Sequence, residues 1–168
     1  GISPDYEVKP DELSQFASQL YVRSLIFDYA TDFYWDNPDI AGPGTYSLSK
    51  DTYSDFGDFL RERDFTYESA TENALQRLTE TAKNEKYYSM NEGLFEEMEK
   101  SLSHSLENDL KVFEDEVKRL LEDEIIGRYY YEAGVIEHGL DEDKKKKKAA
   151  EVLNDENKYM STLKGTSG

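Results

Sequence analysis

Apolar residues recur every three or four positions along most of the chain, which is the spacing of amphipathic helices. The first stretch predicts a helix over 11–36, because Pro10 opens it and the residue before Pro38 resists helical backbone angles. Apolar side chains occupy much of its circumference, so we expect this helix to lie centrally. They include Leu13, Phe16, Leu20, Tyr21, Leu25, Ile26, Phe27, Tyr29 and Tyr34.

A loop is predicted over 37–47, because this stretch holds two prolines and two glycines. Ser49 is a suitable N-cap for a second helix, which we expect to end near Asp64. A linker at 65–67 then leads to the next helix. The apolar face of the second helix comprises Tyr53, Phe56, Phe59 and Leu60.

A third helix is predicted with Ser69 or Thr71 as its N-cap, and Glu72 follows Ser69 at the spacing of a capping box. This helix is expected to end near 87–89. Its predicted inward residues are Ala70, Ala74, Leu75, Leu78 and Ala82.

The longest periodic pattern connects Leu94 to Ile125 and predicts one helix of roughly 35 residues, which is long for a globular protein. It continues into 128–131, and we expect a bend at Gly127 or Gly134. Its apolar residues are Leu94, Met98, Leu102, Leu106, Leu110, Phe113, Val117, Leu120, Leu121 and Ile125.

Two further helical segments are predicted near the C-terminal end, one starting at Asp141 and a short one starting at Asn154. The five consecutive lysines at 144–148 follow three acidic residues, so we interpret them as a solvated helix face.

The fold class is therefore all-α, with five or six helices that include one long amphipathic helix. Residues 2–8 differ, since they alternate with period two and predict a short extended segment. We expect three parts: an extended stub at 1–9, a helical domain at 10–164 and a frayed tail at 165–168.

Charge narrows the set of partners. The chain carries 37 acidic and 20 basic residues, for a net charge of −17. Such a surface repels phosphate backbones and anionic lipid headgroups, so we expect no nucleic-acid partner. No stretch is apolar over about 18 residues, so direct membrane insertion is not expected either.

The sequence offers no candidate catalytic residue, cofactor site or metal site. It contains no cysteine, and its two histidines, His104 and His138, lack a second histidine at helical spacing. We expect both histidines to lie on helix surfaces or to be partly buried. No nucleotide-binding loop, nucleophile elbow or calcium loop occurs.

Two runs of aromatic residues are candidates for an interaction surface, because Tyr and Trp are common in binding hot spots. A run of three residues on a helix places at least one ring outward, and the others are expected to serve the core or a domain interface. The candidate residues are Phe33, Tyr34, Trp35, Tyr129, Tyr130 and Tyr131.

Several stretches resemble carboxyl-terminal processing, or tail-specific, serine proteases. Gly1-Ile2-Ser3-Pro4-Asp5 is similar to a segment near the end of their catalytic domain. The rest is similar to a helical tail that some bacterial members carry after it. The similar stretches are 25–30, 55–67, Arg128-Tyr129-Tyr130 with Gly134, and 150–159 with Leu163.

This resemblance implies a Ser/Lys-dyad hydrolase that binds substrate C-termini through a PDZ domain. The nucleophile of that family lies in a motif that Ser69-Ala70-Thr71-Glu72 matches only superficially, and neither Lys86 nor Lys100 stands at the expected spacing of the base. We therefore interpret Ser69 as a helix cap. The chain is expected to be non-catalytic, and the parent protein to be a serine endopeptidase.

The resemblance also implies partners and a location. We expect the helices to dock beside the catalytic and PDZ domains of the parent, or to position protein substrates or another protomer, in the periplasm or cell envelope. The alternative is an independent acidic interaction module, dimeric through the Leu94–Ile125 face. A cytoplasmic location is compatible with the sequence as well.

Overall fold

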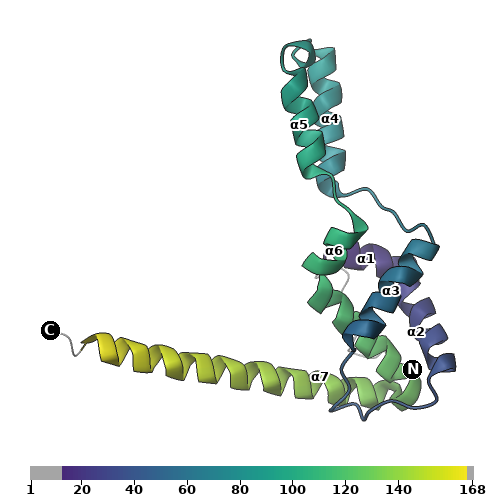
Figure 1. The fold of residues 1–168 in the computed structure, drawn as a ribbon, viewed down its shortest axis with the longest axis vertical. Coiled ribbons are helices and arrows are strands. Elements are labelled where there is room, and N and C mark those ends of the chain that lie inside the picture. Colours follow the sequence, from purple (N-terminus) through teal and green to yellow (C-terminus); the bar gives the residue numbers. More distant parts are fainter. Residues whose placement is uncertain (1–12, 166–168) are drawn as a thin grey trace, which may run out of the picture.

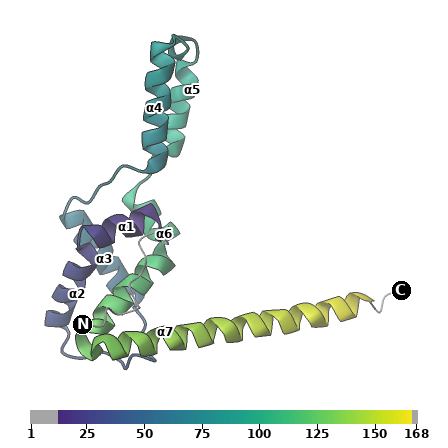
Figure 2. The same cartoon turned by 180° about the vertical axis from the view of Figure 1, so that it is seen from behind.

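The computed structural model describes residues 13–165, and this range folds into seven α-helices and one short 3₁₀ helix without any strand. The helices form a central core from which two limbs project in different directions (Figure 1 and, from behind, Figure 2). The all-α class is confirmed. The predicted stub at 1–9 lies outside the described residues.

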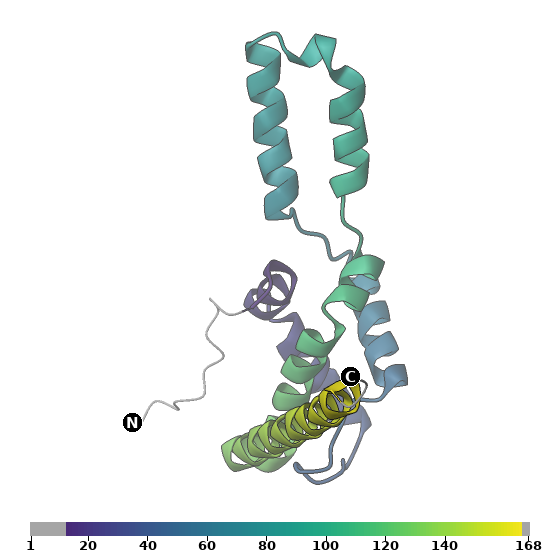
Figure 3. The same cartoon turned by 90° about the vertical axis from the view of Figure 1, so that its left-hand side faces the viewer.

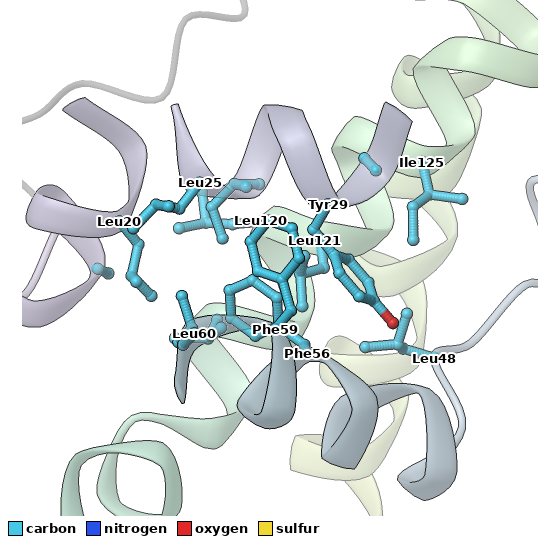
Figure 4. Packing of buried hydrophobic residues seen from close by; sticks show 14 of the residues in the cluster. Leu20, Leu25, Tyr29, Leu48, Phe56, Phe59, Leu60, Leu120, Leu121 and Ile125 are labelled. Atoms are coloured by element: carbon cyan, nitrogen blue, oxygen red, sulfur yellow. The ribbon is translucent and has the colours of Figure 1, made fainter. Parts of the chain in front are cut away.

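The core consists of short helices wrapped around the first part of one long helix. The short helices are α1 (Gln15–Val22), α2 (Leu25–Asp36), α3 (Lys50–Glu62) and α6 (Leu106–Val112), and the long one is α7 (Glu114–Gly165). Figure 4 shows side chains from α1, α2, α3 and α7 meeting between the ribbons. The fully buried ones include Phe16, Leu20, Ile26, Phe56, Leu60, Val117, Leu121, Ile125 and Ile126.

The predicted single helix over 11–36 is wrong, because the chain turns between α1 and α2. Ser24 adopts a left-handed conformation with φ of 60°, and its N–H bonds to the Tyr21 carbonyl at 3.0 Å. The turn lets Leu20 and Ile26 both reach the core, each at most 2% exposed. Burial thus overrides a local sequence that carries no helix breaker at this point.

The second predicted helix is confirmed as α3. The Ser49 hydroxyl accepts a hydrogen bond from Thr52 N at 3.0 Å, as an N-cap does. Phe56, Phe59 and Leu60 are buried on its inner face.

The first limb is a helical hairpin made of α4 (Ala70–Asn84), the 3₁₀ helix η2 (Tyr88–Met90) and α5 (Glu92–Leu102), and it points away from the core (Figures 1 and 3). Leu75 and Ala82 are buried in it. The other predicted inward residues are exposed, because two helices cover only a narrow stripe of each other. They are Ala70, Ala74 and Leu78.

The predicted continuous helix from Leu94 to Ile125 is wrong, because α5, α6 and α7 divide it. The chain is extended at Ser103, and the Ser105 hydroxyl caps α6 by accepting from Asn108 N at 3.2 Å. A second turn at Phe113 separates α6 from α7. These breaks let α6 return to the core while α5 stays in the hairpin.

The second limb is the distal part of α7, which bends at Tyr131 with φ of 57° and ψ of −164°. The bend therefore lies between Gly127 and Gly134, at neither of the two expected positions. The helix then continues past the predicted starts at Asp141 and Asn154 as a long arm. The lysines at 144–148 are exposed on it, as predicted. No helix of the described chain is both long and apolar enough to cross a membrane.

Candidate interaction surface

The structure brings the two aromatic runs together, one from the end of α2 and one from α7 just before its bend. The rings of Tyr34 and Tyr129 meet edge to face, with 4.9 Å between their centroids. We call the six residues around this contact the aromatic corner. They are Phe33, Tyr34, Trp35, Tyr129, Tyr130 and Tyr131.

Part of the aromatic corner supports the fold. The Tyr129 hydroxyl donates to the Asn37 carbonyl, and the Tyr130 hydroxyl donates to the Ile40 carbonyl at 3.1 Å. Phe33 packs partly buried against the core. Tyr129 and Tyr130 therefore hold the loop after α2, and Phe33 joins the corner to the core.

The remaining rings face outward. Trp35 and Tyr131 are each 77% exposed, and Tyr34 is 39% exposed. A tryptophan this exposed is uncommon, because its large apolar ring gains free energy by burial. Each run thus presents at least one outward ring, as its helical spacing predicts. Whether these rings bind a partner stays a prediction.

An acidic groove of about 530 Å³ lies between α2 and α7. Its walls combine apolar residues such as Phe27 and Val135 with carboxylates such as Asp123 and Glu132. Burial raises the pKa of Asp123 to about 6, although the nearby His138 and Arg119 act in the opposite direction.

Arg128 ties the two helices together at this groove. Its guanidinium donates to the Phe27 carbonyl at 2.7 Å, to the Thr31 hydroxyl at 2.8 Å and to Glu124 at 2.8 Å. It also lies over the Phe27 ring, 4.5 Å from the centroid. Arg128 is thus engaged within the domain, and its role here is structural.

His138 joins the start of the arm to the loop after α2. It is only 3% exposed, which corrects the expectation of a surface or partly buried histidine. Its Nδ1 lies 2.9 Å from the Pro43 carbonyl oxygen. Its Nε2 lies 3.4 Å from Glu122 Oε2, without the geometry of a hydrogen bond.

The structure also reveals a polar cluster that the sequence does not indicate, at the base of the hairpin. His104 joins Asp109 of α6, Glu72 of α4 and Tyr67 of the linker before α4. These residues are up to 42 positions apart in the chain, so no local spacing connects them.

Ser69 caps α4, as predicted. Its hydroxyl accepts from Glu72 N at 3.1 Å, and the Glu72 carboxylate accepts from Ser69 N at 2.9 Å.

Across residues 13–165, no group of three histidine, aspartate or glutamate side chains is arranged to hold a metal ion.

Comparison with known proteins adds one match. The model of a family described as "Probable PDZ-protease, C-terminal helical domain" matches residues 16–153. No curated protein and no solved structure matches the chain. The family match spans the core, the hairpin and much of the arm, so the resemblance found in the sequence is confirmed at the level of the family. The chain belongs to the family of C-terminal helical domains of probable PDZ-proteases.

Proposed function

We propose that this domain docks onto the catalytic and PDZ domains of its parent protease and helps to position protein substrates there. The parent is proposed to be a serine endopeptidase with a Ser/Lys dyad, acting in the periplasm or cell envelope. The domain itself supplies no catalytic group.

The aromatic corner carries this proposal. Trp35 and Tyr131 are exposed, whereas Tyr129 and Tyr130 are anchored to carbonyl groups of the neighbouring loop. Rings that are held in place lose little conformational freedom when a partner covers them. A large exposed ring on such a support has the properties of an interface hot spot.

The arm supports a second contact. Beyond Glu142, each α7 side chain that the structure describes is exposed, including Val152, Leu153, Tyr159 and Met160. A lone helix of this kind gains little stability from its own backbone bonds, because packing of an apolar face supplies most helical stability in proteins. We call these four exposed apolar residues the arm stripe. A partner that covers the arm stripe would stabilise the arm.

The same stripe favours the second candidate, an acidic interaction module that pairs with another protomer. The predicted dimer face from Leu94 to Ile125 is not available as one surface. Val117, Leu120 and Leu121 on it are buried in the core of the same chain. We therefore expect two protomers to pair through the exposed apolar residues of the arm.

The test is binding in trans between this domain and a parent protein that lacks it. Trp35→Ala is expected to weaken the complex about tenfold or more, because a tryptophan at an interface centre contributes at least about 1.4 kcal/mol. Met90→Ala is the matched control, since Met90 is 76% exposed at the far end of the hairpin. Equal binding by both variants would remove the aromatic corner from the interface.

A second measurement separates the two candidates. Sedimentation of the isolated domain reports its oligomeric state, with Leu153→Asp as the variant that disrupts the arm stripe. A dimer that this variant dissociates would favour the interaction module. A monomer that binds the parent, and that leaves unstructured peptides uncleaved, would favour the docking domain.

A further inference from the structure

His104 lies where the hairpin joins the core. The chain enters the hairpin through the linker that contains Tyr67 and leaves it through the extended residues around His104. The imidazole ring contacts three segments there: this linker, the first turn of α4 at Glu72, and α6 at Asp109. One side chain therefore connects both ends of the hairpin to the core.

Both ring nitrogens of His104 face acceptor groups. Nδ1 lies 2.7 Å from Asp109 Oδ2. Nε2 lies 2.9 Å from the Tyr67 carbonyl oxygen and 3.1 Å from Glu72 Oε2. A neutral imidazole has one N–H and an imidazolium has two, so only the protonated ring satisfies both sides.

The surroundings of the ring consist of groups that favour a cation. Tyr67, Glu72 and Asp109 are the titratable residues that face it, from the linker, α4 and α6. The Tyr67 hydroxyl donates to Asp109 Oδ2 at 3.1 Å, the same oxygen that faces His104 Nδ1. Burial alone would lower the pKa of His104, but the hydrogen bonds to Asp109 and Tyr67 and the two carboxylates outweigh it and raise the pKa.

We propose that His104 is a pH-dependent latch that fixes the hairpin to the core when it is protonated. Asp109 is 4% exposed and keeps the remaining N–H when the ring loses a proton. The bare Nε2 then faces the Tyr67 carbonyl and the Glu72 carboxylate, which repel its lone pair. Deprotonation thus releases the hairpin side of the cluster.

The direction of the effect follows from the raised pKa. The tie is complete below the ordinary histidine pKa of about 6.5 and is lost as the pH rises through the higher pKa of the folded state. Gln15 remains as a pH-independent tie, since its amide donates to the Glu68 carbonyl at 3.0 Å and accepts from Ala70 N at 2.8 Å. The hairpin therefore gains freedom without detaching.

The test measures the distance between the hairpin tip and the core. The chain has no cysteine, so Met90→Cys and Val22→Cys provide two exposed sites for spin labels. The distance distribution is expected to be narrow at about pH 6 and broader at about pH 9, on either side of a raised histidine pKa.

Two variants assign the effect to one residue. His104→Gln is expected to give a broad distribution at both pH values, whereas His138→Gln, which changes the other histidine, is expected to keep the dependence on pH. Two results would overturn the latch. One is a distance distribution that does not change with pH when His104 is present, and the other is a dependence on pH that survives in His104→Gln.

Nitrogen NMR of the His104 ring gives an answer that does not depend on a variant's folding. Both ring nitrogens are expected to be protonated at the lower pH, and only Nδ1 at the higher pH. A neutral ring at both pH values would also overturn the proposal.

Discussion

The ring of Tyr34 lies edge-on against the ring of Tyr129, which joins the end of α2 to the last straight part of α7 across 95 residues of sequence. The Tyr129 hydroxyl donates to the Asn37 carbonyl at the same place. The contact fixes both the exit of the chain from α2 and the position from which the arm leaves the core.

Tyr129→Phe is expected to lower the free energy of unfolding by about 1 kcal/mol, because the Asn37 carbonyl loses its donor. Denaturant unfolding followed by circular dichroism measures the change. Tyr131→Phe is the matched control, since Tyr131 is exposed, and its effect should stay within about 0.5 kcal/mol. A larger effect in the control would mean that the bend depends on the Tyr131 hydroxyl.

Gly134→Ala is expected to destabilise the bend by about 1–3 kcal/mol. A Cβ at this position would lie 2.3 Å from Tyr130 Cβ and 3.3 Å from Ile126 Cγ2, so the chain must shift. Gly127→Ala is the control, because its Cβ would meet only Val135 Cγ2, at 3.6 Å. Thermal unfolding of the two variants should separate them, and equal midpoints would contradict the close approach.

Asp123→Asn is expected to be more stable than the unsubstituted chain, by a margin that grows as the pH rises from about 4 to about 7.5. Folding raises the pKa of Asp123 from 3.8 to about 6, so the ionised carboxylate is less stable in the folded than in the unfolded chain. This cost is absent when the carboxyl is protonated in both states and is complete above about pH 6. The difference in unfolding free energy should grow by about 1–3 kcal/mol. Asp143→Asn, on the exposed arm, should show no such trend.

Ser69→Ala is expected to lower stability by about 1 kcal/mol through loss of the α4 cap, and to leave peptide hydrolysis by the parent protease unchanged. Ser89→Ala, at an exposed position beyond α4, is the control for stability. Loss of hydrolysis in Ser69→Ala with an intact fold would make Ser69 catalytic and would contradict its assignment as a cap.

The sequence predicts those elements whose signals are local. Ser49 and Ser69 mark the starts of α3 and α4, and the proline- and glycine-containing loop after α2 has its own composition. The family resemblance adds the position of the chain within a larger protein. The caps and the loop depend on residues only a few positions apart, so they can be recognised in a single sequence.

The breaks that the sequence does not predict have tertiary causes. Arg23-Ser24 interrupts an unbroken apolar pattern because the turn there lets Leu20 of α1 and Ile26 of α2 both reach the core. The break before Ser105 has a faint local signal, since three polar residues, Ser103-His104-Ser105, stand within the apolar series. The site at His104 requires Tyr67 and Asp109 to meet, which only the path of the folded chain determines.

The slender form of the hairpin has a consequence for how its length can change. Leu75 and Ala82 are its buried apolar residues on α4, and neither belongs to the main core cluster. Whole turns added to or removed from both of its helices would change how far the tip extends while the base, with its cap at Ser69, keeps its contacts. The length of the hairpin is thus independent of the packing of the core and of the contacts at the hairpin base.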